Sequence, residues 1–221
     1  MGIITGYICL LFMILLLVKY ITKRCHLTKI NALLMRIHKY AAGGFLVVGI
    51  AHFILVIKVI DTRNIVVVLS GIVILVAGIA LVFVCHSMKN RKKELMFHRG
   101  FSLVITVMLI IHVVSYFVDF NSYQKAIRDI LIDEVNLNTI ENGEYIGECD
   151  AGYIYAKVKV TVYNHAITNV ELLEHDHERG DKAESIVQTI VDEQRVDVDA
   201  VSGATNSSKV IEKACANALM K

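Results

Sequence analysis

The chain has 221 residues, 55% of them hydrophobic, and a formal net charge of +2. This content is too apolar for a soluble domain and predicts membrane spans. The nearly neutral charge says little about partners, and nothing in the sequence points to nucleic acid.

Four apolar runs fill the first half of the chain, at about 3–18, 41–60, 65–85 and 101–118. Each is near the ~20 residues that cross a bilayer as a helix. The second half carries the charged and turn residues. We therefore predict a membrane α-helical bundle of four spans over residues 1–120, followed by a small α+β domain over residues 139–221. Apolar residues at helical spacing predict that residues 121–138 form a connecting amphipathic helix.

The loops between the apolar runs predict the orientation of the spans. Basic residues gather in the first and third loops, as Lys19, Lys23, Arg24, Lys29, Arg36 and Lys39, and as Lys89, Arg91, Lys92, Lys93 and Arg99. The second loop has only Lys58 and Arg63, with Asp61. Because basic loops stay in the cytoplasm, the chain leaves the fourth span on the outer side. We expect a multi-pass protein of the cell membrane with an extracytoplasmic carboxy-terminal domain.

The second and fourth spans each carry two histidines at the same separation. His38 and His52 are 14 residues apart, as are His98 and His112. This is close to four helical turns, so each pair lies on one helix face with about 21 Å between its members. The two spans run in the same direction. His38 and His98 (the inner pair) therefore share one depth in the membrane, and His52 and His112 (the outer pair) share another. Because neutral imidazole is a good axial ligand for haem iron, the pattern predicts two b-type haems.

The paired spacing resembles the two-haem pattern of ferric reductase-like and other b-type cytochrome membrane domains, although those usually have six spans. Gly43, Gly44 and Gly49 would let a porphyrin approach the backbone. His86 is a further candidate ligand at the end of the third span. The alternative is that these histidines are polar packing groups, hydrogen-bonded between helices without haem.

The second half of the chain alternates between strand and helix patterns. Strands are predicted at 144–148, 153–163 and 167–173, an amphipathic helix at 182–194 and a last helix from residue 205. Asn164-His165 is predicted to form a turn between two strands.

The chain has five cysteines, none of them in a Cys-x-x-Cys pair. Neither a c-type haem attachment site nor an iron–sulfur framework is therefore indicated. Cys149 and Cys215 could form a disulfide outside the cytoplasm or remain two buried thiols.

A conspicuous motif, Asp199-Ala200-Val201-Ser202-Gly203-Ala204-Thr205, opens the last predicted helix. The backbone N–H groups and the positive dipole end of a helix start favour a phosphate there. The motif resembles the flavinylation motif of FMN-binding domains in the G and C subunits of Rnf and Nqr redox complexes. In that family a flavin transferase attaches FMN through its phosphate, as an ester on the threonine.

The resemblance extends over about the last 80 residues and implies an FMN site. The residues that it assigns to this site are Thr205 as the acceptor, Ser202, Gly203, Ala204, Asp199, Ser207 and His175. The alternative is an ordinary helix cap with a Gly-Ala turn. His175 and His177 also form a His-x-His pattern, but no further metal ligand follows at a recognised spacing.

Together these features predict a transmembrane flavocytochrome, either an oxidoreductase or an electron-transfer component. Electrons would pass from a quinol or a cytoplasmic reductase through haem b to covalent FMN on the outer face. The alternatives are a haem-free, membrane-anchored FMN-binding relay module and an accessory subunit of an ion-translocating redox complex. The expected partners are the membrane, a flavin transferase and a quinol or redox partner protein.

Overall fold

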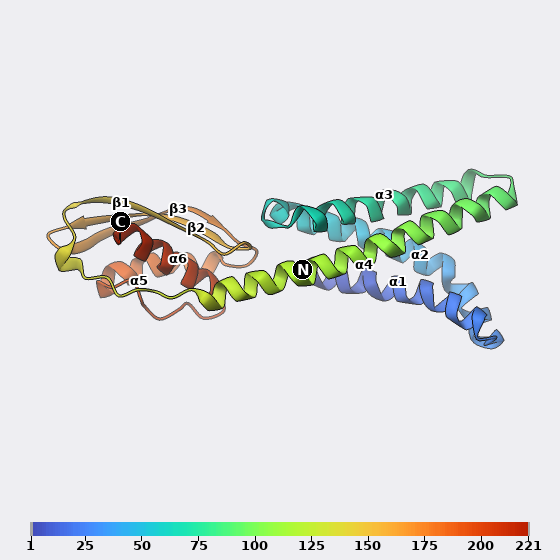
Figure 1. Ribbon diagram of the computed structural model, residues 1–221, viewed down its shortest axis with the longest axis horizontal. Helices are drawn as coiled ribbons and strands as arrows, with labels where there is room; N and C mark the ends of the chain where they lie inside the picture. The colour runs from blue at the N-terminus through green and yellow to red at the C-terminus, as the bar shows by residue number, and fades with distance from the viewer. Residues whose placement is uncertain (1, 221) are drawn as a thin grey trace. The chain divides into compact units, whose positions relative to one another are not determined.

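Four long helices occupy the first half of the computed structural model (Figure 1). They are α1 (Gly2–Arg24), α2 (Thr28–Val56), α3 (Ile65–Ser87) and α4 (Arg91–Asp129), with a short 3₁₀ helix, η1 (Ile57–Thr62), after α2. All four are long and apolar enough to cross a membrane, which confirms the predicted bundle of four spans. The structure describes residues 2–220, which divide into two compact units with the boundary between Tyr116 and Phe117.

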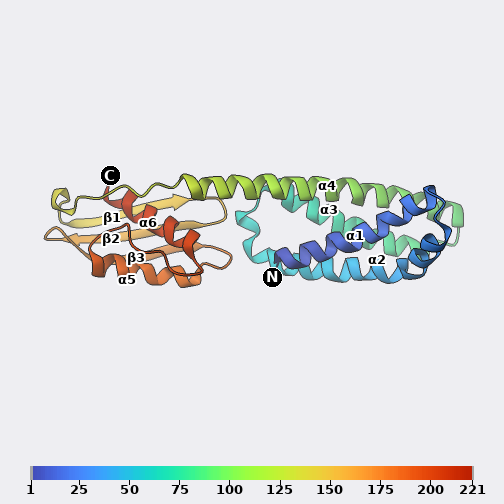
Figure 2. The same cartoon turned by 90° about the horizontal axis from the view of Figure 1, so that it is seen from below.

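The membrane helices form two hairpins, α1 with α2 and α3 with α4. The connections within the two hairpins lie at the same end of this unit (Figure 2). The helices meet in a small core made of Cys9, Met13, Phe45, Ile74, Ala77 and Ile105. Many of the other large apolar side chains are exposed, as contact with lipid tails allows.

The chain beyond the fourth span differs from the prediction. A single helix, α4, continues to Asp129, and the following residues up to Asn136 are not helical. Ile130 and Ile132 pack against the core of the second unit while Leu131, between them, is 74% exposed. This alternation is that of an extended chain, so packing on the domain overrides the helical spacing of the sequence. The predicted helix over 121–138 is therefore wrong beyond Asp129.

The second unit is built on a three-stranded antiparallel sheet in the order β1-β2-β3. The strands are β1 (Gly143–Asp150), β2 (Tyr155–Tyr163) and β3 (Ala166–Asp176), and the helices are η2 (Leu137–Thr139), η3 (Asp181–Ser185), α5 (Ile186–Glu193) and α6 (Thr205–Leu219). Every second residue of β2 is buried, and α6 lies against the sheet (Figure 1). This confirms the small α+β domain. The predicted helix at 182–194 is split, because its first turn is the 3₁₀ helix η3.

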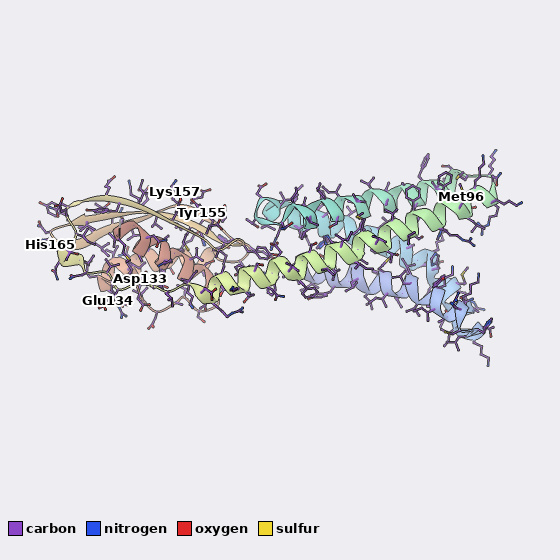
Figure 3. The ribbon with its side chains drawn as sticks, in the orientation of Figure 1. Met96, Asp133, Glu134, Tyr155, Lys157 and His165 are labelled. Carbon is purple, nitrogen blue, oxygen red and sulfur yellow. The ribbon has the colours of Figure 1, made fainter. Side chains whose placement is uncertain are left out.

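Two local features fix the shape of this domain. A Cβ atom at Gly147 of β1 would overlap the backbone of Ala214 and Ala218, so the strand and α6 touch directly. Asn164 and His165 have φ angles of 51° and 59°, which are those of a two-residue β-hairpin turn. This confirms the predicted turn and puts His165 at the tip of the β2–β3 hairpin (Figure 3).

Candidate functional site

A tight turn leads into α6 and is closed by a serine side chain. The Ala204 amide donates to the Val201 carbonyl at 3.0 Å, and Gly203 between them has a φ of +81°, a left-handed conformation that glycine adopts without strain. The Ser208 hydroxyl accepts from the Val201 amide at 3.0 Å and donates to the Ala204 carbonyl at 3.2 Å. Ser208 is fully buried and was not among the residues that the sequence singled out.

Thr205 is the first residue of α6, and its side chain is exposed. The preceding residue, Ala204, offers no side-chain acceptor, so the amides of the first turn are not capped by it. Uncapped amides at a helix start can bind a phosphate. Of the other residues assigned by sequence, Asp199, Ser202 and Gly203 are exposed, whereas Ala204 and Ser207 are buried.

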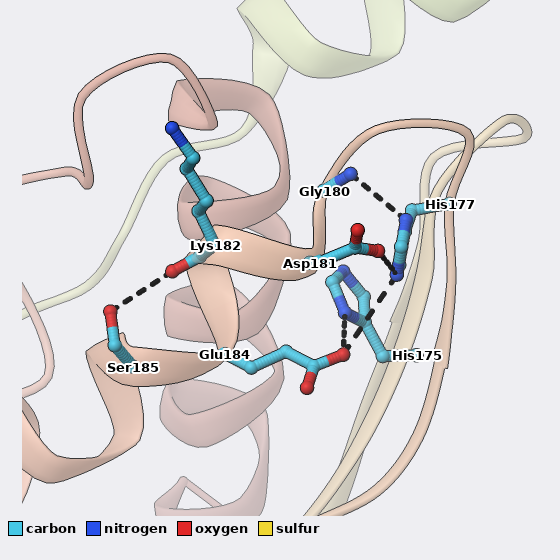
Figure 4. Close-up of polar contacts among 7 residues, drawn as sticks. All are labelled: His175, His177, Gly180, Asp181, Lys182, Glu184 and Ser185. Carbon is cyan, nitrogen blue, oxygen red and sulfur yellow. Dashed lines mark hydrogen bonds and ion pairs between the residues drawn. The ribbon is translucent and has the colours of Figure 1, made fainter.

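The end of β3, with His175, and the following loop, with His177, approach the first turn of α6. A Cβ atom at Gly180 would overlap the Ser207 hydroxyl and lie 3.0 Å from Cγ of His177. The Gly180 amide donates to Nδ1 of His177 at 2.9 Å, and the rings of His175 and His177 lie 4.2 Å apart (Figure 4). His175 and Ser207, which the sequence assigned to one site, therefore lie in the same region of the domain.

His175 is the most unusual side chain of this cluster. It is only 3% exposed, its Nδ1 lies 3.1 Å from a Glu184 carboxylate oxygen, and its Nε2 is buried with no hydrogen-bond partner in the described chain. Burial lowers the pKa of His175, although the Glu184 carboxylate opposes this shift. The ring is therefore neutral at pH 7, and Nε2 is available to a ligand.

Glu184 also completes a group of possible metal ligands. Donor atoms of His175, His177 and Glu184 all lie within 4.8 Å of one another, a donor set that zinc accepts. His177 Nε2 is also 3.1 Å from the Asp181 carboxylate (Figure 4). Sequence spacing did not reveal these acidic residues because η3, which carries them, returns to the histidines only in the folded domain.

An aromatic pair lies beside the same turn. Asn206 donates to the Tyr123 hydroxyl at 2.7 Å, and the Tyr123 ring stacks on Tyr153 with 4.9 Å between ring centres. Tyr153 in turn donates to Asp119 at 2.9 Å. Tyr123 is far from Asn206 in sequence, so no local pattern could predict this contact.

In the membrane unit, the rings of the inner pair lie close together. The ring centres of His38 and His98 lie 6.1 Å apart at an interplanar angle of 33°. A metal atom bound between two imidazole nitrogens at about 2 Å from each would separate the ring centres by about 6 Å. The spacing of this pair would therefore allow the two imidazoles to hold one metal ion between them.

The outer histidines are held by the neighbouring helix of their own hairpin. His52 Nδ1 lies 2.9 Å from the Gly2 carbonyl and 3.1 Å from the Thr5 hydroxyl. His112 Nδ1 lies 3.0 Å from the Val67 carbonyl and 3.2 Å from the hydroxyl of Ser70. A carbonyl can only accept, so Nδ1 carries the proton in both rings and Nε2 keeps a lone pair. This is the tautomer that a metal-binding histidine adopts when a carbonyl orients it.

A glycine lies beside the ring of each outer histidine. A Cβ at Gly6 or Gly71 would lie 3.2 Å from Cε1 of His52 or His112 respectively. A Cβ at Gly43 or Gly49 would meet nothing within 4 Å. Gly44 differs from the expectation, because the Phe12 ring of α1 fills its surroundings and a Cβ would meet that ring at 2.7 Å.

The cysteines are free thiols throughout the described chain. Cys215 is fully buried, which raises its pKa to about 12, and burial also raises the pKa of Cys149. Of the two alternatives for Cys149 and Cys215, the structure shows thiols and no disulfide.

Comparison with known proteins bears on the second unit. Residues 152–220, about a third of the chain, match the model of the FMN-binding domain family. The match supports an FMN-binding domain here. It spans β2 to α6 and includes the turn before Thr205, the Gly180 loop and both histidines of the cluster. The chain matches none of the curated proteins and none of the solved structures with which it was compared.

Proposed function

We propose that the protein is a membrane flavocytochrome. Two b-type haems, held by His38 with His98 and by His52 with His112, would exchange electrons with an FMN esterified to Thr205. The haem part rests on the tautomer of the outer imidazoles, whose Nδ1–H groups point at backbone carbonyls. The flavin part rests on the family match and on the uncapped helix start at Thr205.

Different residues of the chain would have different roles in binding the two cofactors. Each histidine would offer a ring nitrogen to iron, and the first helix of each hairpin would fix the outer ring. The amides at the start of α6 would hold the phosphate, while Ser208 keeps the turn closed. Haem carries one electron and FMN one or two, so the flavin can serve one-electron and two-electron partners.

The orientation follows from the basic loops. Lys23 and Arg24 end α1, and Arg91, Lys92 and Lys93 begin α4, so both hairpin connections are basic. Under the positive-inside rule these connections are cytoplasmic and the FMN-binding domain is extracytoplasmic. A quinol or a cytoplasmic reductase would then supply electrons, and a flavin transferase would attach the FMN outside.

A second candidate is a haem-free anchor that carries the FMN-binding domain as a relay, alone or as an accessory subunit of an ion-translocating redox complex. The filled surroundings of Gly44 favour it, because the Phe12 ring occupies part of the room expected for a porphyrin. In that case the histidine hydrogen bonds would serve only to hold the helices together.

Flavin attachment is tested with Thr205→Ala and with the matched control Thr168→Ala, an exposed threonine on β3. Both are co-expressed with a flavin transferase and denatured, and the flavin fluorescence of the protein band is measured. We expect the band to fluoresce in the control and to be dark in Thr205→Ala. Fluorescence that survives in Thr205→Ala would place the attachment elsewhere.

Haem is tested by absorption spectra and haem quantitation of the full chain from a haem-sufficient host. We expect reduced b-type bands and two haems per chain, falling to one in His52→Ala and in His112→Ala, with His165→Ala as the control. A flavin-loaded protein without these bands would support the anchor. Purification of a stoichiometric multi-subunit complex would support the accessory subunit.

A further inference from the structure

The two membrane hairpins carry matching residues at equivalent positions. Four pairs of equivalent residues relate the two hairpins: Thr5 and Ser70, Gly6 and Gly71, His38 and His98, and His52 and His112. The pairs on the first helix of each hairpin are 65 positions apart, and those on the second helix are 60 apart. Equivalent positions also share the core of the unit, Cys9 with Ile74 and Phe45 with Ile105.

The correspondence extends to the contacts of the outer histidines. In each hairpin the Nδ1 of the histidine meets a carbonyl and a hydroxyl of the first helix, and its Cε1 lies over a glycine of that helix. An imidazole that donates Nδ1–H to a carbonyl is a stronger electron donor at Nε2. Such a ligand stabilises the oxidised state of a bound iron.

The inner pair lacks this arrangement in the described chain. The Nδ1 of His98 lies 3.4 Å from the Ser102 hydroxyl of its own helix, at the limit of a hydrogen bond. Positive charge instead acts on the inner rings, because Lys19 interacts electrostatically with both, whereas the Arg91 and Glu94 charges that also act on His98 are paired with each other. Nearby cations favour the reduced state of an iron, which has one positive charge fewer.

We propose that the carbonyls of Gly2 and Val67, with Gly6 and Gly71 beneath the rings, are the positioning groups of the outer site and give it a lower midpoint potential than the inner site. This inference rests on the proposed haem sites. In each hairpin, the first helix would thereby set how strongly a histidine of the second helix donates electrons to iron.

The order of potentials has a consequence for electron distribution. The first electron that enters the pair resides at equilibrium on the inner site, and the outer site is reduced second. Movement from the inner to the outer site is then unfavourable in the absence of a membrane potential. A membrane potential that is negative inside drives an electron outward and so offsets the difference between the two midpoint potentials.

The order is tested by redox titration of the b-type absorption bands in the full-length protein. We expect two components of unequal potential. His52→Ala or His112→Ala should remove the lower one, and His38→Ala or His98→Ala the higher one. Loss of the higher component in the outer variants would overturn the proposed order. Protein without haem would instead overturn the haem sites themselves.

The positioning role is tested with Gly6→Ala and Gly71→Ala. Each added methyl group lies 3.2 Å from the ring and pushes it away from its carbonyl, so the lower component should shift to a more positive potential while two haems remain bound. Gly100→Ala is the matched control, since a Cβ there meets nothing within 4 Å. A lower component that stays unmoved in both variants, or that moves equally in Gly100→Ala, would contradict the positioning role.

Discussion

Gly180 lies directly against the hydroxyl of Ser207, with no room for a methyl group between them. We predict that Gly180→Ala displaces the first turn of α6, destabilises the domain by about 1–3 kcal/mol and lowers flavin attachment several-fold. In-gel flavin fluorescence and thermal unfolding measure the two effects. Gly143→Ala is the control, because a Cβ there makes only ordinary contacts at 3.5 Å or more. Equal fluorescence in the two variants would show that this contact has no part in attachment.

Ser208 should matter for stability more than its size suggests. Ser208→Ala removes the acceptor of the Val201 amide and the donor to the Ala204 carbonyl. A part-buried amide left without its acceptor costs about 1–3 kcal/mol, so we expect the free energy of unfolding to fall by that amount and the unfolding temperature to fall with it. Thermal unfolding of the full chain, compared with Thr168→Ala, provides the measurement. An unchanged unfolding temperature would mean that the turn closes without the serine.

The buried carboxyl group of Glu212 should make the stability of the domain depend on pH. Glu212 is 2% exposed, and burial followed by repulsion from Asp197 raises its pKa to about 7. One of its carboxylate oxygens has no hydrogen-bond partner among the described residues. The folded state keeps the proton while the unfolded state, with a pKa near 4.5, releases it. Stability contributed by the neutral form is therefore complete below about pH 4.5 and is lost as the pH rises toward 7.

The variant Glu212→Gln does not titrate and should flatten this dependence. At pH 8 we expect it to be more stable than the natural chain by about 2 kcal/mol, and at pH 4.5 to differ little. Thermal unfolding at the two pH values measures the difference. A gain of the same size at both would show that titration of Glu212 is not the cause.

The orientation of the spans can be read from cysteine labelling. Cys25 is exposed in the connection between α1 and α2, which we propose to be cytoplasmic. In intact cells a membrane-permeant maleimide should label it and an impermeant one should not. His165→Cys in a Cys25→Ser background should react with both reagents, because its position is at the tip of the β2–β3 hairpin (Figure 3). Labelling of Cys25 by the impermeant reagent would reverse the proposed orientation.

Hydrophobic patterning was enough to predict the four helices, the strands and the start of α6, because each depends on residues close in sequence. The end of α4 could not be predicted this way, since Ile130 and Ile132 are extended only by packing against a distant sheet. Glu184 and Tyr123 reach the candidate site for the same reason. The glycines under the outer histidines did leave a signal, the recurring separation of 65 residues, but only the structure shows that these glycines touch the rings.

The continuity of α4 has a practical consequence for anyone who wishes to express the FMN-binding domain in water-soluble form. The family match begins at residue 152, which leaves out the whole of β1. Even a fragment that begins at residue 139 would lack Ile127, which is buried in the core, and Tyr123, which holds Asn206. Such fragments should aggregate. A fragment that begins near Phe117 should stay soluble, because it keeps the last turns of α4, which pack on the core of the domain.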